Sequence, residues 1–146
     1  MAVIEFQTRV NAPPEKVFAY VADLEKHVEW SNSGEIRKTS EGPIAAGSTY
    51  ESQEKGPMGR TMKEKVEVTE YQPNERFGWR SYGPMGAHLD WSFELRPENG
   101  VTLLIQRLEP PSGLLATAIL KLVAERQMRK EVPQGLARIK EKVEAS

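Results

Sequence analysis

Glu64 is the residue whose surroundings most strongly suggest chemistry. It stands between Met62 and Val66 in an alternating run, so its carboxylate shares a strand face with apolar side chains. A buried carboxylate is costly unless it is paired, and burial raises its pKa. Glu64 could therefore anchor a ligand or act as a general acid. The alternative is a structural role, either near solvent or in an ion pair with Arg107 or Arg80.

The two histidines are weaker candidates. His88 and Asp90 stand two residues apart, so on a strand they share a face and could form the pair that orients a general base. No nucleophile accompanies them, and we expect that face to be the solvated one. His27 lies beside Glu29 in a short helical segment, and we predict that its side chain is exposed.

Other kinds of site lack their usual residues. The sequence has no cysteine and no His-x-x-x-His spacing, so we expect no metal site. It has neither a Gly-x-Gly-x-x-Gly run nor a Walker-type loop, so we expect no nucleotide cofactor. Its 20 basic and 21 acidic residues give a net charge of −1, which predicts no nucleic-acid partner. The catalytic residues stay unknown, and the pattern leans away from an enzyme.

The N-terminal part predicts one strand and two short helices. Residues from Ile4 to Val10 alternate apolar and polar, as in a strand with one buried face. Pro13 and Pro14 interrupt the strand and favour the start of a helix. Apolar residues then recur at helical spacing from Val17 to Leu24, and a second short helical segment is predicted from Leu24 to Trp30.

The central part predicts six strands. Turns rich in glycine and proline separate them, and connections this short join antiparallel neighbours, so we expect a meander. The predicted strands are Ile36–Ser40, Ser48–Lys55, Thr61–Tyr71, Arg76–Tyr82, Ala87–Arg96 and Val101–Leu108.

The C-terminal part predicts one long helix. Apolar residues follow at helical spacing from Ser112, a plausible N-cap, to Val143. Pro133 lies inside this segment and should kink it. Strands flanked by helices indicate the α+β class, with helices on one face of an antiparallel sheet.

Three segments resemble motifs of the START-like or SRPBCC helix-grip superfamily, which includes polyketide cyclases and lipid-transfer domains. Asn11–Phe18, followed by Asp23 and Trp30, resembles its "A-P-P-E-x-V-F … D … W" opening. Glu70–Phe77 resembles its "E-Y-x-P-x-x-R" turn, and Trp91–Leu95 resembles its late hairpin. The resemblance covers residues 1–146 as one domain. It implies a helix-grip fold: a seven-stranded curved antiparallel sheet around a long C-terminal helix, with two short helices after the first strand.

The resemblance implies a function class without choosing a member. The first reading is a carrier or sensor that binds a small hydrophobic or aromatic ligand, such as a lipid, between sheet and helix. The alternatives are a polyketide cyclase or dehydratase-like enzyme and a co-chaperone-like interaction module, because fold does not fix function. A carrier needs an apolar cavity with an anchor, and an enzyme needs converging groups with shifted pKa values. An interaction module needs a filled core and an exposed apolar patch.

The alternation of the strands selects the residues that should face the cavity. The faces of Val101–Leu108 stay open, because both are apolar. Asp23 is expected to cap its helix and Trp30 to pack the short helices on the sheet. Met58 and Met85 occupy two Gly-Pro-Met-Gly turns at one end of the meander, where they could form an apolar lip. The predicted ligand-binding residues are Met58, Met62, Glu64, Phe77, Trp79, Met85, Trp91, Phe93, Leu115 and Ile119.

The remaining expectations concern location and assembly. The first ten residues carry charges within an alternating pattern, unlike a signal peptide. The most apolar run, Gly113–Ala124, is shorter than the roughly 18 residues that a membrane span needs. We therefore expect a soluble, cytoplasmic monomer or homodimer.

Overall fold

The strands form a single sheet. The computed structural model describes residues 3–55, 57–83, 88–109, 113, 115, 118 and 125–146. The sheet is antiparallel, and its seven strands follow the order β1-β7-β6-β5-β4-β3-β2, which confirms the predicted meander from β2 to β7. The strands are β1 (Ile4–Val10), β2 (Ile36–Lys38), β3 (Thr49–Lys55), β4 (Thr61–Gln72), β5 (Arg76–Tyr82), β6 (His88–Glu98) and β7 (Val101–Glu109).

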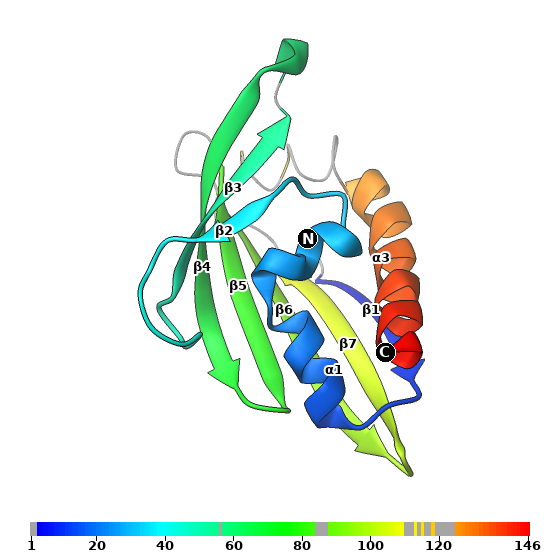
Figure 1. Cartoon of the computed structure of the whole chain (residues 1–146). Helices are drawn as coiled ribbons and strands as arrows, with labels where there is room; N and C mark the ends of the chain where they lie inside the picture. Colours follow the sequence, from blue (N-terminus) through cyan, green and yellow to red (C-terminus); the bar gives the residue numbers. More distant parts are fainter. Residues whose placement is uncertain are drawn as a thin grey trace.

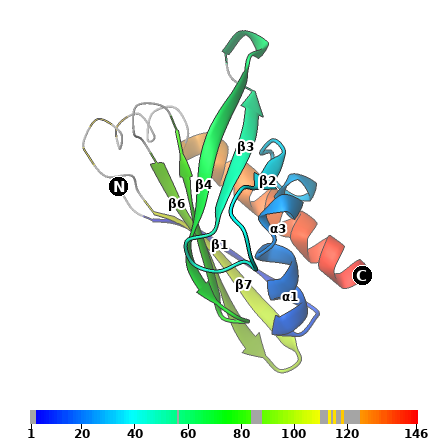
Figure 2. The same cartoon turned by 60° about the vertical axis from the view of Figure 1, so that its left-hand side comes forward.

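Three helices of the described part of the chain lie together on one side of the curved sheet (Figures 1 and 2). They are α1 (Pro14–Val21), the 3-10 helix η1 (Leu24–Glu29) and α3 (Glu125–Ala145). The predicted C-terminal helix is confirmed from Glu125 onward and contains Pro133, while its expected N-cap, Ser112, lies outside the described residues. The kink at Pro133 stays a prediction. Within the described part of the chain, no helix is long and apolar enough to cross a membrane.

The helix starts follow from local chemistry. Pro14 is the first residue of α1, where its fixed φ suits the helix and its missing N–H costs no hydrogen bond. The Asp23 carboxylate caps η1 by accepting a hydrogen bond from the Glu25 N–H at 3.2 Å, as predicted.

The register decides which side chains face the helices. Trp79 stands opposite Trp91, and Phe77 opposite Phe93, all on the inner face. On β7, Gln106 pairs with Phe93, so the inner set is Thr102, Leu104, Gln106 and Leu108. The register therefore identifies the inner face of β7, which the sequence left open.

Two apolar residues on the outer face of β7 are also buried. Leu103 is 7% exposed and Ile105 is 2% exposed. Leu103 lies between Arg9 of β1 and Arg96 of β6 in the register, and Ile105 is flanked by Gln7 and Glu94 in the same way. Long side chains of this kind cover apolar neighbours with their stems. Both faces of β7 are therefore buried, although only one faces the helices.

The outer face also carries paired charges. Arg80 Nε donates to Asp90 at 2.6 Å, and His88 Nε2 lies 3.7 Å from the same carboxylate. Arg107 Nε donates to Glu5 at 2.7 Å. The outward position of His88 and Asp90 is thus confirmed, and neither arginine pairs with Glu64.

The prediction that His27 is exposed is wrong, because its side chain is only 2% exposed. In a 3-10 helix residues three apart share a face, so His27 turns inward together with the buried Leu24. Its Nε2 lies 2.9 Å from the Val21 carbonyl oxygen, and its ring packs against Trp30 and Trp79. Burial lowers the pKa of His27 to about 4.

This buried imidazole should make stability depend on pH. Its folded pKa of about 4 lies below the ordinary 6.5, so protons bind preferentially to the unfolded chain. The contribution is absent above pH 6.5 and lowers the free energy of unfolding as pH falls from about 6.5 to 4, by up to about 1.4 kcal/mol per pH unit. His27→Gln keeps a donor for the Val21 carbonyl and should flatten that slope in urea denaturation. His88→Gln, on the outer face, should keep the wild-type slope, and equal slopes in all three proteins would contradict the assignment.

Candidate ligand-binding cavity

A cavity of about 290 Å³ lies between the inner face of the sheet, the chain around η1 and α3. Its wall combines aromatic, aliphatic and polar side chains. The residues that line it are His27, Trp30, Ser31, Asn32, Ser33, Ile36, Ser52, Glu54, Glu64, Val66, Trp79, Ser81, Leu89, Trp91, Gln106, Met128, Glu131, Val132, Gly135 and Arg138.

All three tryptophans of the sequence line this cavity. Trp79 and Trp91 come from opposite positions on β5 and β6, and their rings are nearly parallel, 6.1 Å apart between centroids and inclined by 9°. Trp30 follows η1, and its ring lies 5.7 Å from that of Phe93. Aromatic side chains therefore line the cavity from both the sheet and the helical layer.

The cavity brings together three of the predicted site residues, Glu64, Trp79 and Trp91. Phe77 and Phe93 point to the same side of the sheet but are fully buried in the packed core. They support the aromatic wall without lining it.

Three other predicted residues, Met62, Leu115 and Met58, are not among the described lining residues. Met62 is half-buried on β4, Leu115 is 74% exposed, and Met58 is 97% exposed in the short turn η2 (Pro57–Gly59), at the tip of the β3–β4 hairpin (Figure 1). Met85 and Ile119 lie outside the described residues. A ligand-binding role for these residues, and the apolar lip formed by the two turns, stay predictions.

Sequence reasoning missed His27, Ser52 and Gln106 as lining residues. Gln106 is a polar residue between Leu104 and Leu108 on one strand face, and the same pattern identified Glu64. It was missed because the sequence did not decide which face of β7 points inward. Ser52 was readable from alternation on β3, where it shares the inner face with Tyr50 and Glu54.

Glu64 faces the cavity without an ion-pair or hydrogen-bond partner for its carboxylate among the described residues. Burial, and then the neighbouring Glu54 carboxylate, raise its pKa. Glu64 pairs with Ser52 across β3 and β4, which makes Glu54 its diagonal neighbour. Glu54 itself accepts a hydrogen bond from the Gly34 N–H at 3.1 Å. The half-buried end of the cavity is thus acidic.

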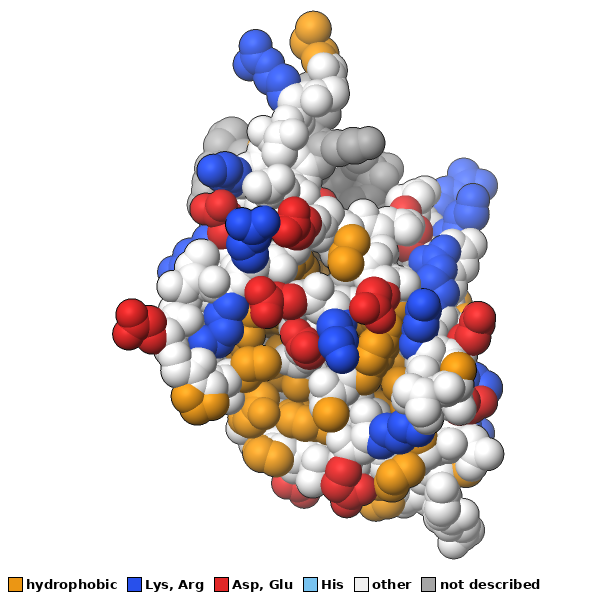
Figure 3. All heavy atoms as spheres, viewed as in Figure 1, with side chains coloured by type: hydrophobic (Ala, Val, Ile, Leu, Met, Phe, Trp, Pro, Cys, Tyr) orange, Lys and Arg blue, Asp and Glu red, His pale blue; other side chains and the backbone are white. Residues whose placement is uncertain are grey.

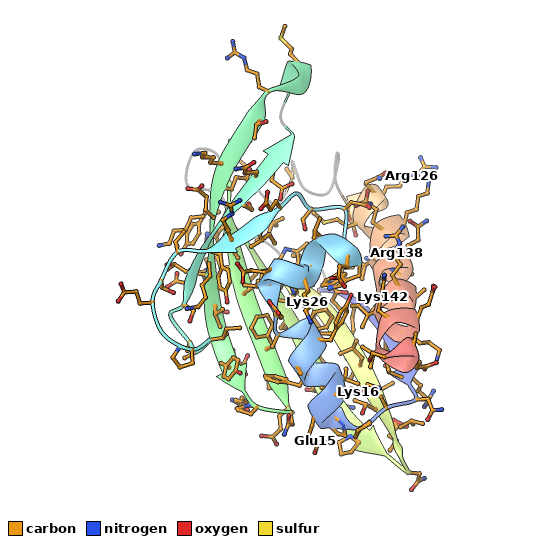
Figure 4. All side chains as sticks on the ribbon, viewed as in Figure 1. Glu15, Lys16, Lys26, Arg126, Arg138 and Lys142 are labelled. Carbon is orange, nitrogen blue, oxygen red and sulfur yellow. The ribbon has the colours of Figure 1, made fainter. Side chains whose placement is uncertain are left out.

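The α3 side supplies one further carboxylate and one cation to the wall. Glu131 accepts a hydrogen bond from Gln127. Arg138 extends from α3 toward the segment after η1 (Figure 4), and its Nη1 donates to the Trp30 carbonyl oxygen at 3.1 Å. Charged side chains of both signs cover this face of the molecule, with hydrophobic side chains visible between them (Figure 3).

Two buried polar atoms in the wall have no hydrogen-bond partner in the described part of the chain. They are Trp30 Nε1, a donor, and Gln106 Oε1, an acceptor, and both residues are only 4% exposed. Buried polar groups in folded proteins are nearly always paired, so these two are exceptions that need an explanation.

Comparison with solved structures shows the same fold in other proteins. A crystal structure of TTHA0849 from Thermus thermophilus matches with a TM-score of 0.72 and 19% identity, covering 99% of this chain and 98% of that one. The solution structure of the Aha1 dimer from Colwellia psychrerythraea matches with a TM-score of 0.68 and 19% identity, covering 99% and 97%. At this level of identity the likeness establishes the fold alone.

Two sequence comparisons complete the picture. An uncharacterized protein of Mycobacterium tuberculosis, Rv0088, is 33% identical over 87 residues; the match spans 58% of this chain and 38% of that protein's length. The family model described as "Polyketide cyclase / dehydrase and lipid transport" matches residues 1–144, nearly the whole chain. Together with the seven-stranded sheet and the C-terminal helix, this match confirms the helix-grip resemblance, and the chain belongs to the polyketide cyclase / dehydrase and lipid transport family.

Proposed function

We propose that this protein binds a small hydrophobic or aromatic molecule in the cavity between the sheet and α3. The observation that carries the proposal is a cavity of about 290 Å³ that collects all three tryptophans and leaves buried polar atoms unpartnered. Ligand sites in proteins have this character: apolar walls with a few placed polar groups. Family membership supports the same class of ligand.

The cavity volume limits the size of the ligand. Pockets for drug-sized molecules usually range from about 300 to 1,000 Å³, so this one is at the small end. A molecule with one to three rings suits it better than a long acyl chain. The cavity also disfavours the co-chaperone-like interaction module, because a protein that acts only through its surface would be expected to fill its core.

A second candidate function is proton transfer on the bound molecule. One observation favours it: the two described cavity residues with clearly displaced pKa values, His27 (lowered) and Glu64 (raised), line the same cavity from the helical layer and from the sheet. A neutral imidazole can accept a proton, and a carboxyl group whose pKa is raised can donate one. Such chemistry also requires the molecule to bind first, so binding remains the primary proposal.

Filling the cavity should abolish binding. Ser81 lies on the inner face of β5, opposite Val66 and Leu89, and lines the cavity. In Ser81→Phe the ring would occupy the ligand's space, so the affinity for the uncharged fluorescent probe N-phenyl-1-naphthylamine should fall at least about tenfold. The melting temperature should stay equal or rise, because the added ring is buried against apolar side chains.

The control for this change is Ser92→Phe. Ser92 lies on the outer face of the neighbouring strand, opposite Gly78 and Arg107. It adds the same ring without touching the cavity, so probe affinity should be unchanged. A folded Ser81→Phe protein that binds the probe like the wild type would mean that the probe binds elsewhere.

Removing the charge of Glu64 tests its role as an anchor. Glu64→Gln eliminates a partly desolvated carboxylate that has no partner among the described residues, so the melting temperature at neutral pH should be equal or higher. Native mass spectrometry first identifies molecules that co-purify with the protein. The affinity for such a ligand, if the carboxylate holds it, should be lower in the variant. Glu51→Gln, which removes an exposed outer-face carboxylate 3.8 Å from Lys63, is the matched control. Lower stability with unchanged binding would identify Glu64 as a structural residue instead.

A further inference from the structure

Two side chains of the cavity wall each carry a fully buried polar atom that has no hydrogen-bond partner among the described residues. Trp30 Nε1 and Gln106 Oε1 are both buried, and their residues are each 4% exposed. Two other polar groups of the wall do have partners: His27 Nε2 contacts the Val21 carbonyl oxygen, and the Ser52 hydroxyl donates to the Glu64 carbonyl oxygen. The buried atoms without a hydrogen-bond partner in the described part of the chain also include Tyr50 Oη and Glu94 Oε2, but only Trp30 and Gln106 among these residues line the cavity.

Both side chains adjoin Phe93. The Trp30 ring lies 5.7 Å from the Phe93 ring, and Gln106 stands directly opposite Phe93 in the β6–β7 register. Glu64 is on β4, three strands away from Gln106 on β7. The cavity thus has a buried end with one donor and one acceptor, and a half-buried end with two carboxylates, those of Glu54 and Glu64.

A donor and an acceptor that do not bond to each other call for a group that can do both. The Trp30 N–H needs an acceptor, and the Gln106 oxygen needs a donor. A hydroxyl group supplies both functions through a single oxygen atom. It also satisfies Gln106 if the carboxamide is turned over, since the hydroxyl then accepts from the amide NH₂.

We propose that the ligand is an uncharged alcohol or phenol with an apolar or aromatic body, inserted with its hydroxyl group toward Trp30 and Gln106. This inference rests on the proposed binding function and specifies its ligand class. The Trp30 N–H donates to the hydroxyl oxygen, and Gln106 accepts the hydroxyl hydrogen. A carboxylate is disfavoured at both ends: at the buried end its charge would lose its hydration and it brings no proton for the Gln106 oxygen, and at the other end it meets Glu54 and Glu64.

The test compares three probes with the same ring system by isothermal titration calorimetry on the 146-residue chain. They are 2-naphthol, which donates and accepts, 2-methoxynaphthalene, which only accepts, and naphthalene, which does neither. We expect 2-naphthol to bind about tenfold tighter than naphthalene, equivalent to about 1.4 kcal/mol. An apolar cavity without polar partners would give the opposite order, because burying an unpaired hydroxyl is unfavourable. The methoxy compound should lose most of the advantage.

The variant Gln106→Met assigns the preference to this site. Methionine has a similar length and no amide, so the advantage of 2-naphthol should shrink to less than about threefold while naphthalene binds as before. Gln7→Met, at an exposed position on the outer face of β1, should keep the wild-type preference. Trp30→Phe removes the N–H and keeps an aromatic ring. If Gln106→Met does not fold, the preference for 2-naphthol over naphthalene is measured in this variant instead.

The outcomes separate the two proposals. If naphthalene binds as tightly as 2-naphthol or tighter, the hydroxyl assignment is overturned while the binding function stands. The same holds if the preference for 2-naphthol survives in both Gln106→Met and Trp30→Phe. If none of the three probes binds, the proposed function and the ligand class both fail.

Discussion

The close contact between Trp30 and α3 is the constraint on which the rest of the structure depends. A Cβ atom at position 135 would lie 3.2 Å from the Trp30 ring and 3.4 Å from its carbonyl oxygen, so Gly135 lets the helix approach this closely. Arg138, one turn later, donates to the same carbonyl oxygen. The Trp30 ring also packs against His27 and Phe93. One side chain therefore joins η1, the sheet and α3, and the cavity is the space left beside it.

The charged groups of the two sheet faces differ in how they are paired. On the outer face Arg76 bonds Glu70 at 2.6 Å and Glu94 at 3.1 Å, and Arg80 bonds Asp90 at 2.6 Å. In the cavity, Glu64 has no such partner within the described residues, and burial raises its pKa. Departures from complete pairing are expected where a protein binds something else. The unpartnered groups of the cavity wall are the physical reason for treating it as a site.

The strands were predictable because their alternation and turns are clear. The bounds of β5 agree with prediction, and Trp79 and Trp91 were correctly assigned to the inner face. On β7 the alternation could not identify the inner face, because both faces are apolar. Leu103 and Ile105, on the outer face, are buried beside long neighbouring side chains. Only the pairing with β6 identifies Gln106 as an inner residue.

The helical layer was harder to predict at the level of side chains. A spacing of three residues turns His27 inward, and nothing in the local composition indicates that η1 is a 3-10 helix. The pairing of Trp30 with Gly135 joins residues 105 positions apart, far beyond the reach of local patterns. The motif resemblance identified Trp30 as a packing residue. It did not indicate that the Trp30 N–H would lack a partner beside a cavity.

The central claim is that a small aromatic molecule enters this cavity, and the indole N–H signals of the protein test it most directly. The sequence has three tryptophans and all of them line the cavity, so a nitrogen–proton correlation spectrum gives three reporters. On titration with 2-naphthol, all three indole signals should shift along one saturable curve, while backbone signals of outer-face residues such as Glu51 and Lys63 stay in place. Indole signals that do not move at saturating probe, or that move no more than the outer face, would contradict the account.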